Sequence, residues 1–233
     1  MLIMIGTDPE AFVKVADEFI SAHQIFPGTK KEPFKVDKGA IQVDGTAVEF
    51  NIDAASSEDE FVANIQTVQT QMLEILHKFD RDAHIEYVPV VQYSDSVWSQ
   101  IPPECKILGC DPDFNVNGQP NPNPINYLQD RPVRTAAGHI HIGFRNPAQF
   151  VSTNRAFKDA LYVANKFHQS GLFQPTTDEE SERLKFYGAN GSFRPKPYGV
   201  ELRAPSNLWL KHETTIRKMY RDVNQTYRMA VGF

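Results

Sequence analysis

The stretch AIQVDGTAVEFNI, which runs from Ala40 to Ile52, predicts a β-hairpin. At its centre stands the dipeptide Asp44-Gly45. Asp and Gly tolerate the positive φ angles that a tight reversal between antiparallel strands requires, so this pair is a strong hairpin signal. We therefore expect an antiparallel sheet that contains this hairpin.

Further strands are expected C-terminal to the hairpin. Residues 85–93 are rich in β-branched and aromatic side chains, and residues 135–144 and 198–204 alternate between apolar and polar side chains. Two segments are expected to be loops. Residues 115–124 are rich in Asn and Pro, and residues 176–183 form an acidic run of the kind that usually lies on a solvated surface.

Three helices are also expected. Ser57 and Glu60 form a capping box, in which both side chains satisfy backbone donors at a helix start. Apolar residues then recur at helical spacing, namely Phe61, Ile65, Val68, Met72, Ile75, Leu76 and Phe79. A second helix is expected from residue 147 or 148 to residue 169, with its end at Gly171, and a third over residues 210–229. This pattern predicts a single α+β domain over residues 1–233, with an antiparallel sheet and helices on one side.

The composition is that of an ordinary globular protein with a small acidic excess. The 233 residues include 24 Lys and Arg against 29 Asp and Glu, a net charge of −5. Proteins that bind nucleic acid non-specifically normally present a basic face, so we do not expect such a partner. We expect no signal peptide, because the apolar start has no basic region, and no membrane span, which needs about 20 apolar residues. A cytoplasmic protein is expected, with Cys105 and Cys110 as ordinary thiols.

Two acidic pairs are the first candidates for chemistry. In Asp8-Pro9-Glu10 the proline favours extended geometry for the residue before it, and residues two apart in an extended segment point to the same face. Asp111 and Asp113 follow the same pattern. Neighbouring carboxylates repel each other unless a cation or water screens them, and Mg²⁺ takes oxygen ligands of this kind. A metal site and a solvated Asp-Pro turn both remain open at each pair.

Polar side chains share one face of two of the expected strands. Glu49 and Asn51 alternate with apolar residues in the hairpin, and His139 and His141 alternate with isoleucines. Two histidines at this spacing are better candidates for metal or phosphate contact than a lone histidine. A wet sheet face for Glu49 and a structural role for the histidines are the alternatives.

The densest group of charged residues lies near the C-terminus. Glu201 and Arg203 share a face of one expected strand, and Arg194 and Lys196 precede them. The simplest interpretation is an ion pair, which stabilises little if it is exposed. In the functional interpretation the carboxylate binds a metal ion, and the guanidinium groups hold phosphate oxygens. Acids, histidines and arginines on one face of a sheet are what phosphoryl transfer from ATP requires.

The order of these motifs resembles that of the glutamine-synthetase-like carboxylate–amine ligases, and most closely their phage-type amidoligase branch. The resemblance covers residues 6–206, which is most of the chain. The motifs that carry it are Asp8-Pro9-Glu10, Glu49, His139-Ile140-His141, and Glu201-Leu202-Arg203 after Arg194. Asp8 departs from the pattern, because better-known members have a glutamate there, and the chain is far shorter than those ligases.

The resemblance implies a single ligase domain whose antiparallel sheet is curved into a half-barrel. Helices would cover the convex side, and the active site would lie on the concave face. It further implies ATP, two or more Mg²⁺ ions, a substrate carboxylate activated as an acyl phosphate, and attack by an amine. The partners would then be small-molecule or peptide carboxylates and amines, and a homo-oligomer is left open.

Residue roles follow from the same resemblance. The implied metal ligands are Asp8, Glu10, Glu49, His139 and Glu201. Arg194 and Arg203 would contact phosphate and, with Glu201, take part in catalysis. Position alone adds His141 and Lys196 as nucleotide contacts. Arg134, Arg145 and Lys196 are unassigned candidates for holding a substrate carboxylate.

Two other functions remain open at this stage. A metal-dependent hydrolase or oxygenase would need only His139, His141 and one carboxylate. A non-catalytic binding or assembly module on a degenerate ligase fold would need none of the proposed chemistry. Mg²⁺-ATP would stabilise the ligase by mass action but not such a module.

Overall fold

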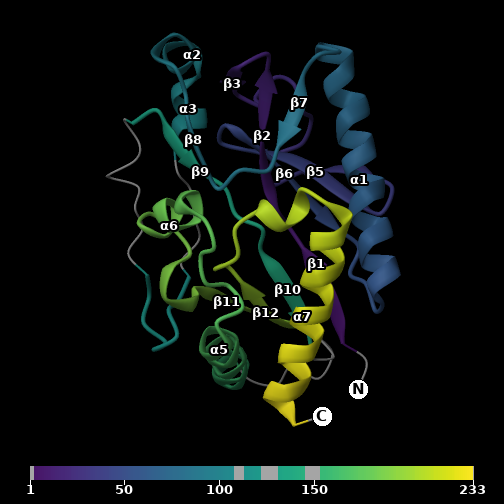
Figure 1. Ribbon diagram of the computed structural model, residues 1–233, viewed down its shortest axis with the longest axis vertical. Helices are drawn as coiled ribbons and strands as arrows, with labels where there is room; N and C mark the ends of the chain where they lie inside the picture. The colour runs from purple at the N-terminus through teal and green to yellow at the C-terminus, as the bar shows by residue number, and fades with distance from the viewer. Residues whose placement is uncertain (1–2, 108–112, 122–130, 145–152, 233) are drawn as a thin grey trace.

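The computed structural model describes residues 3–107, 113–121, 131–144 and 153–232 (Figure 1). Over these residues the fold is mixed α+β, and the paired strands are antiparallel. This confirms the predicted α+β class. Where the sequence predicted one sheet, the described strands are divided among a six-stranded, a four-stranded and a two-stranded sheet.

The hairpin predicted over residues 40–52 is confirmed. Its strands, β5 (Gly39–Asp44) and β6 (Ala47–Ile52), are paired up to Asp44 and Ala47. Gly45 in the turn has a φ of +59°, which glycine adopts without strain. The six-stranded sheet has the order β3-β2-β6-β5-β4, and β7 also pairs with β2. Its other strands are β2 (Glu10–Val15), β3 (Glu18–Ile20), β4 (Phe34–Val36) and β7 (His84–Glu86).

The four-stranded sheet joins the N-terminal strand to late strands of the chain, in the order β1-β10-β12-β11. These strands are β1 (Met4–Thr7), β10 (Ile140–Gly143), β11 (Phe193–Lys196) and β12 (Gly199–Leu202). The two-stranded sheet pairs β8 (Val90–Gln92) with β9 (Val133–Thr135). Residues 85–93 and 135–144 therefore each contain parts of two strands in different sheets, whereas residues 198–204 contain one strand as predicted.

The two larger sheets meet where the chain passes from β1 into β2. Only Asp8 and Pro9 separate these strands. Across the junction, the Glu10 N–H donates to the Ala137 carbonyl at 2.9 Å. Because one short connection joins the sheets, polar residues of both lie at this junction.

Helix α1 (Glu58–Phe79) begins at Ser57 as predicted. The Ser57 hydroxyl accepts the Glu60 N–H at 3.3 Å, and the Glu60 carboxylate accepts the Ser56 N–H at 2.8 Å. The buried stripe ends at Leu76. Phe79 is 58% exposed, so its predicted place in the stripe is wrong, because the last turn of the helix extends past the core.

The later helices differ from the prediction in where they begin, and one of them lies in a segment that was predicted to be a loop. Helix α5 (Thr153–Ser170) ends at Gly171 as predicted, while the predicted start at residue 147 or 148 lies outside the described residues. Helix α7 (Glu213–Val231) starts three residues later than predicted, because residues 208–210 form the 3-10 turn η3. The acidic run at residues 176–183 was predicted to be a loop, which is wrong: it contains most of α6 (Asp178–Leu184). Shorter elements are α2 (Asp95–Gln100), α3 (Pro103–Lys106) and the 3-10 turn η2 (Ala189–Gly191).

The three long helices share one hydrophobic core with both larger sheets. Val48 and Phe50 of β6 and Val200 and Leu202 of β12 lie in this core together with buried residues of α1, α5 and α7. Figure 1 shows α7 running along the sheets between α1 and α5. Because successive strand residues alternate in direction, Glu49 and Glu201 extend from the opposite face of their strands.

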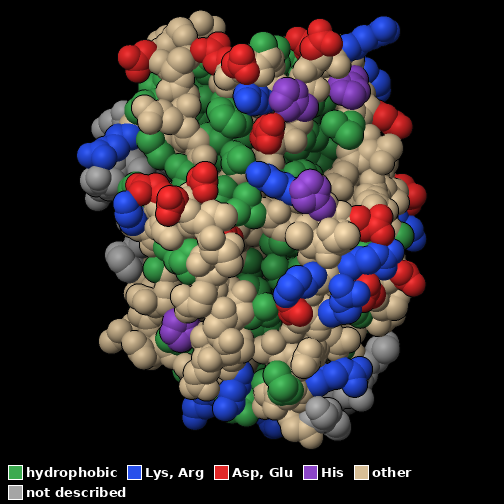
Figure 2. Space-filling model, viewed as in Figure 1, with side chains coloured by type: hydrophobic (Ala, Val, Ile, Leu, Met, Phe, Trp, Pro, Cys, Tyr) green, Lys and Arg blue, Asp and Glu red, His purple; other side chains and the backbone are tan. Residues whose placement is uncertain are grey.

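The surface along α7 carries charges of both signs. Figure 2 shows basic and acidic side chains side by side on this face. Arg217 lies 2.7 Å from both Asp59 and Glu213. Among the described helices, none is long and apolar enough to cross a membrane.

Candidate functional site

Residues from both larger sheets converge at the junction between β1 and β2. Strand register brings them together: His141 and Arg194 are both direct partners of Glu201, and Glu10 is the direct partner of Glu49. Direct partners in an antiparallel pair lie on the same face with Cβ atoms about 5 Å apart. The predicted shared faces of Glu201 with Arg203 and of Glu49 with Asn51 agree with this arrangement.

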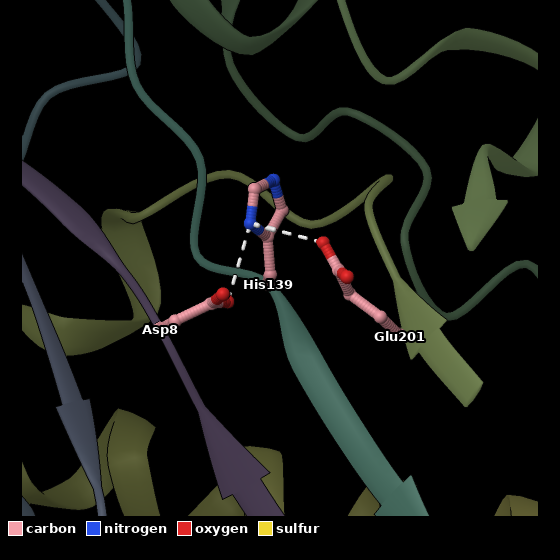
Figure 3. Close-up of side chains that lie close together, drawn as sticks. All are labelled: Asp8, His139 and Glu201. Atoms are coloured by element: carbon pink, nitrogen blue, oxygen red, sulfur yellow. Dashed lines mark ion pairs between the residues drawn. The ribbon is translucent and has the colours of Figure 1, made fainter. Parts of the chain in front are cut away.

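Asp8, His139 and Glu201 form the centre of the site (Figure 3). Figure 3 shows the three side chains pointing toward one another, from the end of β1, the start of β10 and β12. The Nδ1 atom of His139 lies 3.3 Å from Asp8 Oδ1 and 3.8 Å from Glu201 Oε1. One donor atom from each residue lies within 4.8 Å of the others, a spacing that suits a bound metal ion. Glu201 has no exposed side-chain surface.

Side chains of β1 and of η3 hold the backbone at Gly138 and His139. The Thr7 hydroxyl donates to the His139 carbonyl at 2.6 Å, and the Trp209 indole N–H donates to the Gly138 carbonyl at 3.2 Å. These hydrogen bonds fix the backbone position from which the His139 side chain extends. The site is therefore built on strand ends rather than on an exposed loop.

His141 and Tyr198 extend the central cluster. The Nε2 atom of His141 lies 2.8 Å from Asp8 Oδ1, and its Nδ1 atom is hydrogen-bonded to the Tyr198 hydroxyl. Burial would raise the pKa of Asp8, but the positive charge of His141 and the contact with His139 hold it well below its usual range. Although burial lowers the pKa of His141, the charges of Asp8 and Glu201 leave it raised overall. Asp8 is thus held as a carboxylate.

A second acidic group lies beside the first. Single oxygens of Glu10, Asp44 and Glu49 lie within 4.8 Å of one another. Burial and the charge of Asp44 raise the pKa of Glu10 to about 7. Burial, with the charges of Asp8 and Glu10, raises the pKa of Glu49 well above its usual range. The influence of Asp8 on Glu49 places the two acidic groups in one electrostatic environment.

Hydrogen bonds and one lysine partly compensate this second group. The Gln42 amide donates to Glu49 Oε2 at 2.8 Å, and the Ala137 N–H donates to Glu10 Oε2 at 2.9 Å. Lys30 Nζ lies 2.7 Å from Asp44 Oδ2. Within the described parts of the chain, these three carboxylates are balanced by the charge of Lys30 and, at Glu10, by that of Arg203, and the remaining negative charge favours a further cation.

Basic side chains surround Glu201 on its other sides. Lys196 Nζ lies 2.8 Å and Arg194 Nη1 3.3 Å from Glu201 Oε2, and Arg203 Nη1 contacts Oε1. Arg203 also donates from Nε to Asp113 Oδ2 at 3.1 Å. Asp113 is therefore an ion-pair partner of an arginine, and Asp111 lies outside the described residues.

Every residue predicted as a metal ligand or a nucleotide contact lies in this one region. These residues are Asp8, Glu10, Glu49, His139, His141, Arg194, Lys196, Glu201 and Arg203. No known protein-family model matches the chain. No curated protein matches it either. What the site can do must therefore be argued from its own chemistry.

Arg134, one unassigned candidate for a substrate carboxylate, is not part of this region. Its guanidinium group donates to the carbonyls of Arg131 at 3.0 Å, Val133 and Lys106, and it lies 4.5 Å from the ring centroid of Trp98. Such contacts hold backbone segments together. Arg145, a second such candidate, lies outside the described residues, and Lys196, the third, contacts Glu201.

Sequence reasoning missed several residues that contact the site, among them Lys30, Asp44, Tyr187 and Tyr198. Asp44 was predicted only as a residue of the hairpin turn, so its position beside Glu10 and Glu49 was not foreseen. Tyr198 was noted only as part of a strand, although it stands three residues before Glu201. No local sequence pattern places Lys30 or Tyr187 at the site, because each lies in a segment outside the strands that carry the other site residues.

The donors fit a hard divalent cation. The two groups offer five carboxylates and one imidazole, a mainly oxygen set of the kind Mg²⁺ prefers. Asp8 Oδ1 is buried and has no partner with hydrogen-bond geometry among the described residues, although both histidines lie close to it. A cation at this oxygen would satisfy it.

Proposed function

We propose that this protein is an ATP- and Mg²⁺-dependent ligase that joins a carboxylate to an amine. The observation that carries the proposal is the meeting of two acidic groups with three basic side chains around Glu201. Transfer of a phosphoryl group needs both: cations that neutralise the phosphates, and fixed positive groups that stabilise the transferred group.

The metal ligands of this proposal are Asp8, His139 and Glu201 in one group, and Glu10 and Glu49 with Asp44 in the other. Bound Mg²⁺ would supply neutralisation of phosphate charge. Asp44 was not expected from sequence and is added here. Ligands on β2, β5, β6 and β12, and next to the ends of β1 and β10, fit a site on one face of a curved sheet, so the proposal includes the half-barrel fold.

The nucleotide contacts of the proposal are Arg194, Lys196 and Arg203. Arginine presents a planar fork that matches phosphate oxygens, and lysine acts as a point charge. In the described chain these groups are turned toward Glu201, which is fully buried. Glu201 would therefore orient the basic groups as well as bind metal.

The proposed reaction consumes one ATP for each amide bond. A substrate carboxylate oxygen attacks the terminal phosphorus of ATP, which gives an acyl phosphate and ADP. An amine then attacks the acyl carbon, and inorganic phosphate leaves with the oxygen that the carboxylate contributed. The amine loses a proton in this step, and the product is an amide.

The donor set favours this function over a transition-metal hydrolase or oxygenase. Among the described residues, the two groups of closely spaced donors contain one histidine between them. A site with two histidines and one carboxylate would need His141 as its second histidine ligand. The Nε2 atom of His141 is instead paired with Asp8 Oδ1 at 2.8 Å. Five carboxylates suit Mg²⁺ better than iron or copper.

The test is phosphate release from ATP in the presence of Mg²⁺ and mixtures of carboxylic acids and amines. We expect release that depends on both an acid and an amine, and its loss in Glu10→Ala and Glu201→Ala. Glu74→Ala is the matched control, because Glu74 is an exposed acid on α1. ATP binding that keeps its full metal dependence in both site variants would overturn the proposal.

A further inference from the structure

Tyr187 contacts two residues of the site from outside the sheets. It follows α6 in the chain. Its hydroxyl lies 3.3 Å from His139 Nε2, and its ring centroid lies 5.1 Å from Cζ of Arg203. Neither the sequence motifs nor the roles proposed above make use of this side chain.

Arg183, one helical turn earlier, fixes the position of Tyr187. Its side chain is 1% exposed and donates to three backbone carbonyl oxygens at 2.8, 2.8 and 3.2 Å. These acceptors belong to Ala136, Ala204 and Arg203. The Arg183 Cζ lies 5.3 Å from the Tyr187 ring centroid, and the Arg183 carbonyl accepts the Tyr187 N–H at 2.9 Å. Arg183 therefore ties Tyr187 to the strand ends that carry the site.

The two ring nitrogens of His139 face different partners. Nδ1 faces the carboxylates of Asp8 and Glu201, whereas Nε2 faces Tyr187. A metal ion accepts only an unprotonated ring nitrogen, so a neutral His139 that binds through Nδ1 must carry its hydrogen on Nε2. Hydrogen-bond partners of metal-bound histidines generally fix the tautomer and the ring orientation in this way.

We propose that Tyr187 is a positioning residue for the metal site, whose hydroxyl oxygen accepts the Nε2 hydrogen of His139 and leaves Nδ1 free for the cation. This inference rests on the proposed function, because it assigns His139 to a bound cation. The ring of Tyr187 also lies against the guanidinium group of Arg203, a favourable cation–π contact. One side chain thus orients a metal ligand and a phosphate contact together.

Two substitutions separate the hydroxyl from the ring. Tyr187→Phe removes only the hydroxyl, and Tyr187→Leu removes the aromatic ring as well. Tyr162→Phe is the matched control, because the Tyr162 hydroxyl donates to the Ala230 carbonyl on the helical side of the molecule.

The first readout is the tautomer of His139 in the presence of Mg²⁺, because without a cation Nδ1 faces the carboxylates of Asp8 and Glu201 and carries the hydrogen itself. In the full chain labelled with ¹⁵N at histidine, NMR identifies which ring nitrogen of His139 is protonated, and His139→Gln assigns its signal. At the Mg²⁺ concentration that just saturates the wild type, we expect hydrogen on Nε2 in the wild type and in Tyr162→Phe, and a mixture of tautomers in Tyr187→Phe. A merely structural role for Tyr187 would not change this signal.

The second readout is binding of Mg²⁺ and of ATP by calorimetry. We expect Mg²⁺ affinity to fall about tenfold in Tyr187→Phe, as for other hydrogen-bond partners of metal ligands, and to stay unchanged in Tyr162→Phe. Tyr187→Leu should weaken ATP binding as well, because Arg203 loses its packing partner.

The outcomes separate the inference from the proposed function. If the wild type binds Mg²⁺ and Tyr187→Phe keeps both its tautomer and its affinity, the inference is overturned and the ligase proposal stands. A fall in melting temperature alone overturns the inference equally. If the wild type binds neither Mg²⁺ nor ATP, the proposed function is overturned, and the inference is overturned with it.

Discussion

Glu10 and Glu49 lie directly opposite each other on β2 and β6, as register partners in an antiparallel pair. Like charges in such a pair destabilise a sheet. The pKa of both carboxyls is raised: in Glu10 by burial and by Asp44, and in Glu49 by burial and by Asp8 and Glu10. In the metal-free protein this pair costs stability, which a bound cation would restore.

Glu49→Gln should stabilise the metal-free protein by about 1 kcal/mol, because it removes a carboxyl whose ionisation is disfavoured by burial and by Glu10 opposite it, and it keeps an oxygen that accepts the Gln42 amide. The same substitution should reduce the stabilisation that Mg²⁺ gives the wild type, because it removes a ligand from one of the two metal-binding groups. Urea denaturation with EDTA and with Mg²⁺ measures both effects. Glu74→Gln on the exposed face of α1 should change neither. A less stable Glu49→Gln variant that Mg²⁺ stabilises as much as the wild type would contradict this prediction.

The stability of the metal-free protein should fall with rising pH because of Glu10. Its pKa in the folded protein is about 7, above the ordinary value of 4.5, so the folded state holds the proton more tightly. The contribution to stability is fully present below pH 4.5 and is lost as the pH rises through about 7. The loss is up to about 3 kcal/mol. Denaturation curves from pH 4.5 to 8 in EDTA should fall more steeply for the wild type than for Glu10→Gln, and parallel curves would refute the assignment.

Local signals explain why part of the fold could be predicted. The hairpin follows from Asp44-Gly45 and helix α1 from the cap at Ser57, because both signals act within a few residues. The shared face of Glu201 and Arg203 follows from strand alternation, which is equally local. Such features depend little on the rest of the chain.

Long-range packing explains what could not be predicted. Arg183 and Tyr187 reach the site only because α6 packs beside the strand ends, which no local pattern indicates. The helix itself had a signal, since the Thr177 hydroxyl accepts the Glu180 N–H at 3.2 Å in a T-x-x-E pattern. Its acidic composition led to the wrong prediction of a loop.

Arg203→Met should destabilise the protein by about 3–5 kcal/mol, the range for removing one partner of a buried ion pair. Glu201 has no exposed side-chain surface, and Arg203 contacts its Oε1 atom and pairs with Asp113. The control is Arg217→Met, because Arg217 has three acidic partners but is 31% exposed. Pairs at the surface contribute about 0–1 kcal/mol. Equal losses in the two variants, measured by urea denaturation, would show that Glu201 is not buried as described.

Gly188→Ala should destabilise the protein more than Gly171→Ala, and the difference should measure the packing around Arg183. Both glycines have positive φ angles, +78° and +71°. A Cβ atom at Gly188 would lie 2.7 Å from Arg183 Nη1, whereas at Gly171 its nearest neighbour would be a Gln174 side-chain atom at 3.8 Å.

The left-handed backbone alone costs an alanine about 1–2 kcal/mol, and this cost should be common to both variants. Overpacking should add about 1–3 kcal/mol at Gly188 only. Because Arg183 also holds Tyr187, Gly188→Ala should weaken Mg²⁺ binding while Gly171→Ala leaves it unchanged. Urea denaturation and Mg²⁺ calorimetry on the two variants check this. Equal stabilities, or equal Mg²⁺ affinities, would mean that Arg183 does not hold the turn after α6 against the site.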